Sequence, residues 1–265
     1  MIVTPKKFLG QHFLKDLNIA QEIANSLNVV SRTNVLEIGP GMGVLTRFLL
    51  ENQNINLKVV ELDRESVAYL NENFPNLEGR ILAEDFLKLA LCNLFGGESF
   101  FVIGNYPYNI SSQIFFKVLE NKKRIPVCSG MIQKEVAERM AAKPNSKAYG
   151  ILSVLLQAYY DIEYLFTVHE HVFDPPPKVK SAVIRMTRNK VDKLNCDEEL
   201  FTKVVKATFN QRRKMLRNSL AAFIPKECEL MRDSFVTRRP EQLSVDEFVW
   251  LTNQVKAEME NRDRN

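Results

Sequence analysis

The stretch Val35-Leu36-Glu37-Ile38-Gly39-Pro40-Gly41-Met42-Gly43 decides the fold of this chain. Its first half is largely apolar and predicts a short buried strand. Its second half predicts a tight glycine turn, in which the backbone adopts positive φ and can approach a ligand closely. Because a helical pattern over residues 45–52 follows at once, the stretch predicts a strand–turn–helix unit of an α/β fold.

The same alternation of strand and helix continues along the chain. Apolar runs predict strands at residues 34–38, 57–62, 80–83, 100–104 and 127–132, and another helical pattern lies at residues 66–73. Such alternation is typical of a doubly wound, mainly parallel sheet. The last two apolar runs, residues 159–168 and 181–187, have no clear helix between them, which predicts an antiparallel hairpin at one edge of the sheet.

A change of composition divides the chain. Residues 189–196 are polar and predict a linker. After the linker, Asp197 is expected to cap an amphipathic helix that runs to about Ala222, and a last helix is expected over residues 245–260. We therefore expect an α/β domain over residues 1–188, a linker over 189–196 and a small helical domain over 197–265.

The charge of the chain is unevenly distributed. The net charge is only +4, but residues 175–239 hold 16 Lys and Arg against 7 Asp and Glu. A basic segment attached to a nearly neutral one indicates a polyanionic partner. The alternative is a solvated helical surface with no such partner.

Composition and cysteine usage indicate a cytoplasmic protein. The 265 residues are 45% hydrophobic and 26% charged, which is ordinary for a globular protein. The four cysteines form no C-x-x-C pair, which argues against a zinc site and favours a reducing compartment. His169 and His171 have no evident third ligand, so we expect no metal. No signal segment or membrane-spanning stretch is recognisable, and we expect no membrane partner.

Two acidic residues follow the next strands and suggest a nucleoside ligand. Glu61 ends the second strand, 22 residues after Gly39, where a carboxylate accepts hydrogen bonds from ribose hydroxyls. Asp85 follows the third strand and could accept from an adenine amine. There is no phosphate-binding loop, and the first basic residue after the turn is Arg47. A cationic ligand without phosphates, S-adenosylmethionine, therefore fits these acidic residues, to which Glu37 adds a third.

A fourth motif, Asn105-Tyr106-Pro107-Tyr108, follows the strand at residues 100–104. The Asn105 side-chain oxygen and a nearby backbone carbonyl can accept hydrogen bonds from an exocyclic amine. Pro107 fixes the backbone that aims this carbonyl, and the Tyr108 ring can stack on a base. A simple turn after a strand is the alternative, because Asn, Pro and Tyr are common in turns.

Taken in order, these motifs resemble those of the KsgA (RsmA) family of small-subunit ribosomal RNA adenine N(6),N(6)-dimethyltransferases. The resemblance covers nearly the whole chain, including the helical part. The segments that carry it are Lys7–Leu14, the glycine turn, Glu61–Asp63, Glu84–Phe86, Asn105–Tyr108, Gln133–Arg139, Val172–Ser181 and Phe209–Leu216.

The resemblance implies a fold, a cofactor and a set of cofactor contacts. The fold is a Rossmann-like methyltransferase domain with a mostly parallel seven-stranded sheet and an antiparallel edge hairpin, plus the helical domain. The cofactor is S-adenosylmethionine. Its methionine part would be held by the segment that contains Gln11, His12, Phe13 and Leu14, its ribose by Glu61 and its adenine by Asp85, while Gly39, Gly41 and Asn105 would lie close to it.

Two positions depart from the family pattern. His12 stands where Asn is frequent, so its contact is expected through the backbone or an imidazole nitrogen. Tyr106 stands where Leu is usual. If that position contributes its carbonyl oxygen, the change alters the shape of the pocket more than its chemistry.

The resemblance also implies how the target is bound. Asn105, Tyr106, Pro107 and Tyr108 would form the catalytic loop, and the target adenine would leave its stack to be sandwiched by Tyr108 and Phe173. A core position is the alternative for Phe173. Lys178 and Lys180 would flank the pocket. Four basic residues of one predicted helix are expected to contact RNA phosphates: Arg212, Arg213, Lys214 and Arg217.

Three functions fit this pattern. The first is dimethylation of two adjacent adenosines in the 3′-terminal hairpin loop of 16S rRNA in the small (30S) ribosomal subunit, by a monomeric enzyme with a role in subunit biogenesis. The second is an Erm-type enzyme that modifies an adenosine of 23S rRNA. The third is a non-catalytic RNA-binding factor in ribosome assembly. The segments Phe209–Leu216 and Pro175–Lys178 favour the first.

Overall fold

A computed structural model of the chain describes residues 3–6 and 9–264, so Lys7 and Phe8 of the N-terminal motif lie outside the described residues. The chain divides into two compact units. The α/β unit comprises Met1–Ala137 and Asp161–Asn189, and the helical unit comprises Glu138–Tyr160 and Lys190–Asn265. Each unit has its own core and is considered by itself.

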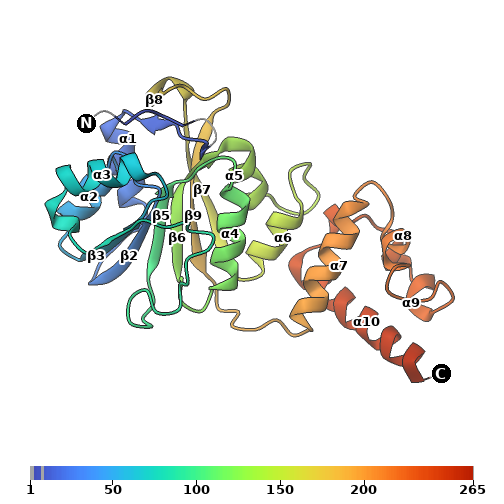
Figure 1. Ribbon diagram of the computed structural model, residues 1–265. Coiled ribbons are helices and arrows are strands. Elements are labelled where there is room, and N and C mark those ends of the chain that lie inside the picture. Colours follow the sequence, from blue (N-terminus) through green and yellow to red (C-terminus); the bar gives the residue numbers. More distant parts are fainter. Residues whose placement is uncertain (1–2, 7–8, 265) are drawn as a thin grey trace. The chain divides into compact units, whose positions relative to one another are not determined.

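The α/β unit is built on a seven-stranded sheet with the strand order β4-β3-β2-β5-β6-β9-β7 (Figure 1). The pairs β2–β3, β2–β5, β3–β4 and β5–β6 are parallel, and β9 is antiparallel to β6. A second, two-stranded sheet pairs β1 with β8. The strands are β1 (Phe13–Leu14), β2 (Thr33–Ile38), β3 (Ile55–Val60), β4 (Ile81–Leu82), β5 (Phe101–Asn105), β6 (Val127–Gln133), β7 (Tyr160–Val168), β8 (Phe173–Asp174) and β9 (Ser181–Arg188).

This architecture confirms the predicted fold class. Each predicted strand begins and ends within about two residues of an observed one, because a buried strand of a parallel sheet is a continuous apolar run. The helices that follow these strands in the α/β unit are α1 (Leu17–Asn25), α2 (Thr46–Glu51), α3 (Arg64–Asn73) and α4 (Ser111–Glu120), and α5 (Lys134–Ala141) continues into the helical unit.

The register of the parallel strands brings their carboxyl ends together. Ile38 at the end of β2 pairs with Val60 of β3 on one side and with Gly104 of β5 on the other. The chain runs outward from β2 in one direction to β3 and β4 and later in the other direction to β5 and β6. Residues that follow β2, β3 and β5 therefore meet at the point where the strand order reverses, which is the usual ligand site of such sheets.

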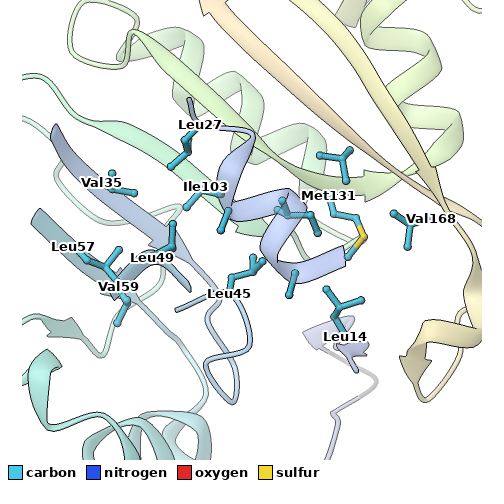
Figure 2. Close-up of a cluster of buried hydrophobic side chains, with 14 of the residues drawn as sticks. Leu14, Leu27, Val35, Leu45, Leu49, Leu57, Val59, Ile103, Met131 and Val168 are labelled. Atoms are coloured by element: carbon cyan, nitrogen blue, oxygen red, sulfur yellow. The ribbon is translucent and has the colours of Figure 1, made fainter. Parts of the chain in front are cut away.

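The two faces of the sheet are covered by different helices. Figure 1 shows α1, α2 and α3 on one side of the sheet and α4 on the other. The first face forms a continuous core in which Val35, Leu57, Ile103 and Met131 from four strands pack against helix residues such as Leu49 (Figure 2). Burial of this apolar surface fixes the strands and so positions the loops at their carboxyl ends.

The helical unit contains α6 (Ile151–Gln157), α7 (Glu198–Asn210), α8 (Leu216–Leu220), α9 (Glu229–Arg232) and α10 (Val245–Arg264). Asp197 caps α7 as predicted, since its carboxylate accepts from the N–H groups of Glu199 and Leu200. The Phe209 ring lies 6.1 Å from that of Tyr149 and 5.8 Å from that of Phe248. These contacts tie the segment before α6 to α7 and α10.

Two predictions about this part of the chain differ from the structure. The helix that begins after Asp197 ends at Asn210 and does not reach Ala222. The compact helical unit also takes in residues 138–160, whereas the sequence placed this segment in the first domain. The physical reason lies in contacts with segments far along the chain: the Asn145 N–H donates to the Glu241 carbonyl at 2.7 Å, and Tyr149 packs on Phe209.

Candidate functional site

A pocket lies at the carboxyl ends of β2, β3 and β5, where the strand order reverses. Every stretch that borders it belongs to the α/β unit. The bordering stretches are Leu9–Leu14 from the N-terminal segment, residues 38–42 with Val44 and Leu45 from the glycine turn, Val60–Leu62, Glu84–Leu87 and Asn105–Ile110. The sequence-predicted cofactor residues, from Gln11 to Asn105, are therefore gathered around one pocket.

The glycine turn forms one wall of this pocket. Gly39 and Gly41 both adopt positive φ, 64° and 56°. A Cβ atom on Gly41 would lie 3.1 Å from the Phe13 ring, so a side chain at this position would be both strained and crowded. The turn therefore requires glycine to bring its backbone to the pocket.

Glu61 holds the turn in place. One carboxylate oxygen accepts from the Gly41 N–H at 3.0 Å, and the other accepts from the Asp63 N–H at 2.8 Å. Burial raises the pKa of Glu61, while these backbone hydrogen bonds oppose the rise. Each carboxylate oxygen has two lone pairs, so Glu61 can still accept from a hydroxyl in the pocket.

The N-terminal segment is fastened beside the same strand end. The Lys6 ammonium forms an ion pair with Asp63, and the Lys6 N–H donates to the Gln11 side-chain oxygen at 2.8 Å. Burial raises the pKa of Asp63, but hydrogen bonds from Lys6, Ser66 and Gln11 outweigh it and hold the pKa below its usual value. The roles of Lys6 and Asp63 could not be predicted from the sequence, because no local pattern signals an ion pair between residues 57 positions apart.

The Asn105 side chain is oriented by the N-terminal segment. Its amide nitrogen donates to the His12 carbonyl oxygen at 3.0 Å, which leaves the amide oxygen to accept from another donor. The His12 ring lies on the Tyr108 ring, with centroids 5.3 Å apart and planes inclined by 29°. His12 Nδ1 lies 2.8 Å from the Pro175 carbonyl oxygen, and since a carbonyl only accepts, Nδ1 carries the proton.

Tyr108 is held in turn by Ser181. The Tyr108 hydroxyl forms a hydrogen bond with the Ser181 hydroxyl at the start of β9. Burial raises the pKa of Tyr108, so the phenol stays neutral near pH 7. The motif Asn105–Tyr108 thus has one side chain held by His12, just before β1, and one held by Ser181 of β9.

Asp85 borders the pocket from the loop between β4 and β5. One of its carboxylate oxygens accepts from the Leu87 N–H at 2.9 Å, and its carbonyl accepts from Lys88 and Leu89. These bonds form a compact turn whose residues Asp85, Phe86 and Leu87 border the pocket.

Three residues of the sequence interpretation lie elsewhere than expected. Phe173 is 1% exposed and belongs to the core, because β8 pairs with β1 and turns the ring inward; it offers no face to a base. Glu37 is buried beside Thr46, outside the pocket, and burial raises its pKa to about 8, so it adds no negative charge for a cationic ligand at pH 7. The Tyr106 side chain is 1% exposed and packs between the sheet and α4.

The predicted RNA contacts fall on two surfaces. Lys178 and Lys180 are exposed in the loop just before Ser181, close to Tyr108 in the chain fold. In the helical unit, Arg212, Arg213 and Lys214 lie in the turn between α7 and α8, so the prediction that they share one helix with Arg217 is wrong. The helix ends at Asn210, and Gln211–Lys214 form a turn closed by the Lys214 N–H to Gln211 carbonyl bond of 2.7 Å.

This turn borders two hollows of the helical unit. Arg213, Lys214 and the carboxylate Glu241 line both hollows, Arg239 lines the first, and Lys147 and Arg212 line the second. Arg212 differs from its neighbours, since its guanidinium donates to the Ser146 carbonyl at 3.2 Å. Arg213 and Lys214 are exposed.

The described residues contain neither a metal-binding cluster nor a membrane-spanning helix. Within residues 3–6 and 9–264 there is no group of three or more His, Cys, Asp or Glu side chains that could hold a metal ion. None of the helices in this part of the chain is long and apolar enough to cross a membrane.

Comparisons with known proteins agree on one family. The model of the family described as "Ribosomal RNA adenine dimethylase" matches residues 3–253. A protein of Phocaeicola vulgatus named "Ribosomal RNA small subunit methyltransferase A" is 64% identical over 261 residues, which are 98% of this chain and 93% of that protein. A protein of the same name from Parabacteroides distasonis is 67% identical over 251 residues, 95% of this chain and 94% of the relative.

Solved structures share the architecture. A dimethyladenosine transferase from Plasmodium falciparum superposes with a TM-score of 0.79 at 22% identity and covers 93% of this chain and 98% of its own. The 23S rRNA methyltransferase ErmE gives a TM-score of 0.67 at 25% identity, covering 91% of this chain and all of its own. The first similarity shows the fold alone.

Proposed function

The chain belongs to the ribosomal RNA adenine dimethylase family, and we propose that it methylates two adjacent adenosines in the 3′-terminal hairpin loop of the 16S rRNA of the small ribosomal subunit. The methyl donor would be S-adenosylmethionine and the acceptors the exocyclic N6 amines, each methylated twice. The observation that carries the proposal is the convergence of Gly41, Glu61, Asp85 and Asn105 on one pocket at the reversal of strand order.

The residues present fit this cofactor. At Gly41 the positive φ and the nearby Phe13 ring disfavour a side chain, so the bare backbone of the turn borders the pocket. Glu61 has lone pairs to accept from ribose hydroxyls, and Asp85 could accept from the adenine amine. Gln11, His12 and Leu14 border the end of the pocket next to Asn105 and would face the methionine part. When bound, the cofactor would supply a methyl group on a positively charged sulfur.

Asn105 would grip the amine of the target base. The lone pair of an adenine N6 amine is delocalised into the ring, which makes the nitrogen a poor nucleophile. The Asn105 amide oxygen and a carbonyl of the Tyr106–Pro107 segment would accept its two hydrogens, and this geometry favours a pyramidal nitrogen with a localised lone pair. Because the His12 carbonyl fixes the amide, its acceptor is oriented before the substrate arrives. No strong general base is needed, since the proton can leave after methyl transfer.

Tyr108 is the aromatic residue we retain for stacking on the target base. Stacking on an aromatic side chain contributes roughly 1–3 kcal/mol per base. The hydrogen bond to Ser181 and the contact with His12 hold the ring at one orientation. Lys178 and Lys180, exposed beside Ser181, would contact the phosphates of the extruded nucleotide.

We place further phosphate contacts in the helical unit, on Arg213, Lys214 and Arg217, and give Arg212 the role of holding the loop at Ser146. With its substrate in the ribosomal subunit, the enzyme would work in the cytoplasm, as a monomer, and would take part in subunit biogenesis. The alternative of a 23S rRNA substrate has weaker support, since the identity with ErmE is 25% against 64% with a relative named for the small subunit.

One assay separates these functions. Purified protein and labelled cofactor are incubated with unmodified small subunits, large subunits and naked rRNA. We expect label in small-subunit RNA, four methyl groups at saturation, and a loss on the order of 100-fold or more in rate for Asn105→Ala. Label only in large-subunit RNA would select the Erm-type function, and binding without transfer would select the assembly factor.

A further inference from the structure

Lys117, in the second turn of α4, reaches a loop that it does not adjoin in sequence. Its ammonium donates to the Phe86 carbonyl at 2.5 Å and to the Leu89 carbonyl at 2.6 Å. The same ammonium lies 5.1 Å from the centroid of the Phe86 ring. A single side chain thus satisfies two backbone acceptors and covers one aromatic ring.

The loop that Lys117 reaches is the adenine end of the proposed cofactor pocket. Asp85, Phe86 and Leu87 border the pocket, while Phe86 itself is only 4% exposed. The turn Asp85–Leu89 follows a strand of two residues and is not part of a helix or strand. Its conformation therefore depends on its own turn bonds, on the burial of Phe86 and Leu89, and on Lys117.

Helix α4 connects this loop to the target-amine loop. It begins at Ser111, three residues after Tyr108, and its first turn is continuous with the motif through the Ile110 N–H to Pro107 carbonyl bond of 3.3 Å. Lys117 is half-buried. Its charge faces Asp85 and Glu120, the two acidic groups that act on it electrostatically.

We propose that Lys117 is a positioning residue, which fixes the Asp85–Leu89 turn to α4 and thereby sets the adenine end of the cofactor pocket relative to the Asn105–Tyr108 loop. This inference rests on the proposed function, because it assigns Asp85 to the adenine. It predicts that removing the ammonium lowers the affinity for ligands that carry adenosine, although Lys117 itself does not border the pocket.

A matched control lies further along the same loop between β4 and β5, where a second lysine contacts the loop. Lys58, in β3, is also half-buried, donates to the Leu94 carbonyl at 2.6 Å and lies 5.1 Å from the Phe95 ring centroid. Neither Leu94 nor Phe95 borders the pocket. Lys58→Met therefore removes an equivalent lysine–carbonyl–phenylalanine contact without touching the adenine turn.

The test is equilibrium binding by calorimetry, with S-adenosylhomocysteine and 5′-methylthioadenosine as probes, the second of which lacks the amino-acid end. We expect Lys117→Met to raise both dissociation constants by about tenfold, which corresponds to about 1.4 kcal/mol. Lys117→Arg keeps the charge and several donors and should restore most of the affinity. Lys58→Met should bind both probes like the unmodified protein. In methyl transfer, Lys117→Met should raise KM for the cofactor more than it lowers kcat.

The outcomes are distinguishable. If the unmodified protein binds neither probe, the proposed function fails. If it binds both and Lys117→Met is unchanged, or if Lys58→Met loses as much affinity as Lys117→Met, the positioning role is overturned. A loss for S-adenosylhomocysteine alone also overturns it, because the effect would then lie at the amino-acid end. If circular dichroism shows that Lys117→Met does not fold, Lys117→Gln is used in its place. The glutamine keeps a polar donor group, so its loss of affinity should lie between those of the Met and Arg variants.

Discussion

Tyr106 is the one position of the proposed catalytic motif that departs from the family pattern, and its side chain is buried at a defined place in the fold. It lies across two glycines: a Cβ on Gly104 would be 3.0 Å from the ring and a Cβ on Gly130 would be 2.7 Å from it. The hydroxyl donates to the Ser129 carbonyl at 2.7 Å, and Phe115 of α4 packs edge-on with centroids 5.5 Å apart. The ring therefore fills space between the sheet and α4, away from the pocket.

This geometry predicts that Tyr106→Leu costs stability and leaves catalysis nearly unchanged. The substitution removes a fully buried ring and leaves the Ser129 carbonyl without its hydroxyl donor. Loss of buried volume and of a buried hydrogen bond together give a cost of about 2–4 kcal/mol in the free energy of unfolding. Tyr106→Phe keeps the ring and loses only the hydroxyl, so its cost should be about 1–2 kcal/mol.

The measurement combines urea unfolding with methyl-transfer kinetics. Far-ultraviolet circular dichroism follows both units, whereas fluorescence of Trp250, the single tryptophan, reports on the helical unit and serves as an internal control. At a temperature where all variants are folded, kcat should stay within about threefold, because the backbone N–H of Tyr106 remains bonded to the Met131 carbonyl at 3.0 Å. A folded Tyr106→Phe variant with kcat reduced by about 30-fold or more would refute a purely structural role for this side chain.

Two further predictions follow from burial and from the basic turn. The pKa of Glu37 is raised to about 8 in the fold from 4.5, so its stabilising effect is fully present below pH 4.5 and is lost as the pH rises through 8. Glu37→Gln stays neutral and still accepts from Thr46. In urea unfolding, the free energy of unfolding of this variant relative to that of the unmodified protein should therefore rise by up to roughly 4–5 kcal/mol between pH 4.5 and 8. Parallel curves of unfolding free energy against pH for the two proteins would contradict this. In filter binding to small-subunit RNA, Arg213→Ala with Lys214→Ala should lower the salt slope by about 2, whereas Arg212→Ala should change stability more than slope. An unaltered slope in the double variant would remove these two residues from the RNA interface.

Strand positions and the order of the site residues could be predicted from the sequence. Apolar runs define buried strands, and a parallel sheet places the residues after each strand at one edge, so Gly39, Glu61 and Asn105 could be grouped without coordinates. The burial of Phe173 could not be predicted in this way. Its neighbours in sequence resemble those of an exposed turn, and only pairing of β8 with β1 turns the ring into the core.

Interactions between distant segments were also beyond sequence reasoning. The end of α7 at Asn210 depends on the turn at Gln211–Lys214, and no proline or glycine in that segment marks it. The membership of residues 138–160 in the helical unit depends on contacts such as Tyr149 with Phe209, which join segments 60 residues apart. Periodicity describes one segment at a time and does not specify its packing partner.

The two departures from the family pattern are accommodated by different means. At position 12 the bond that orients Asn105 comes from the backbone carbonyl, so any side chain that leaves the N-terminal segment in place preserves it; the imidazole adds its own contacts to Tyr108 and Pro175. At position 106 the larger side chain is directed to the opposite face of the sheet, where Gly104 and Gly130 provide room. In both cases the role assigned to the position rests on main-chain atoms: the His12 carbonyl orients Asn105, and the Tyr106 carbonyl belongs to the segment that we propose accepts from the target amine. Substitution at these positions should therefore alter stability before it alters the chemistry of the pocket.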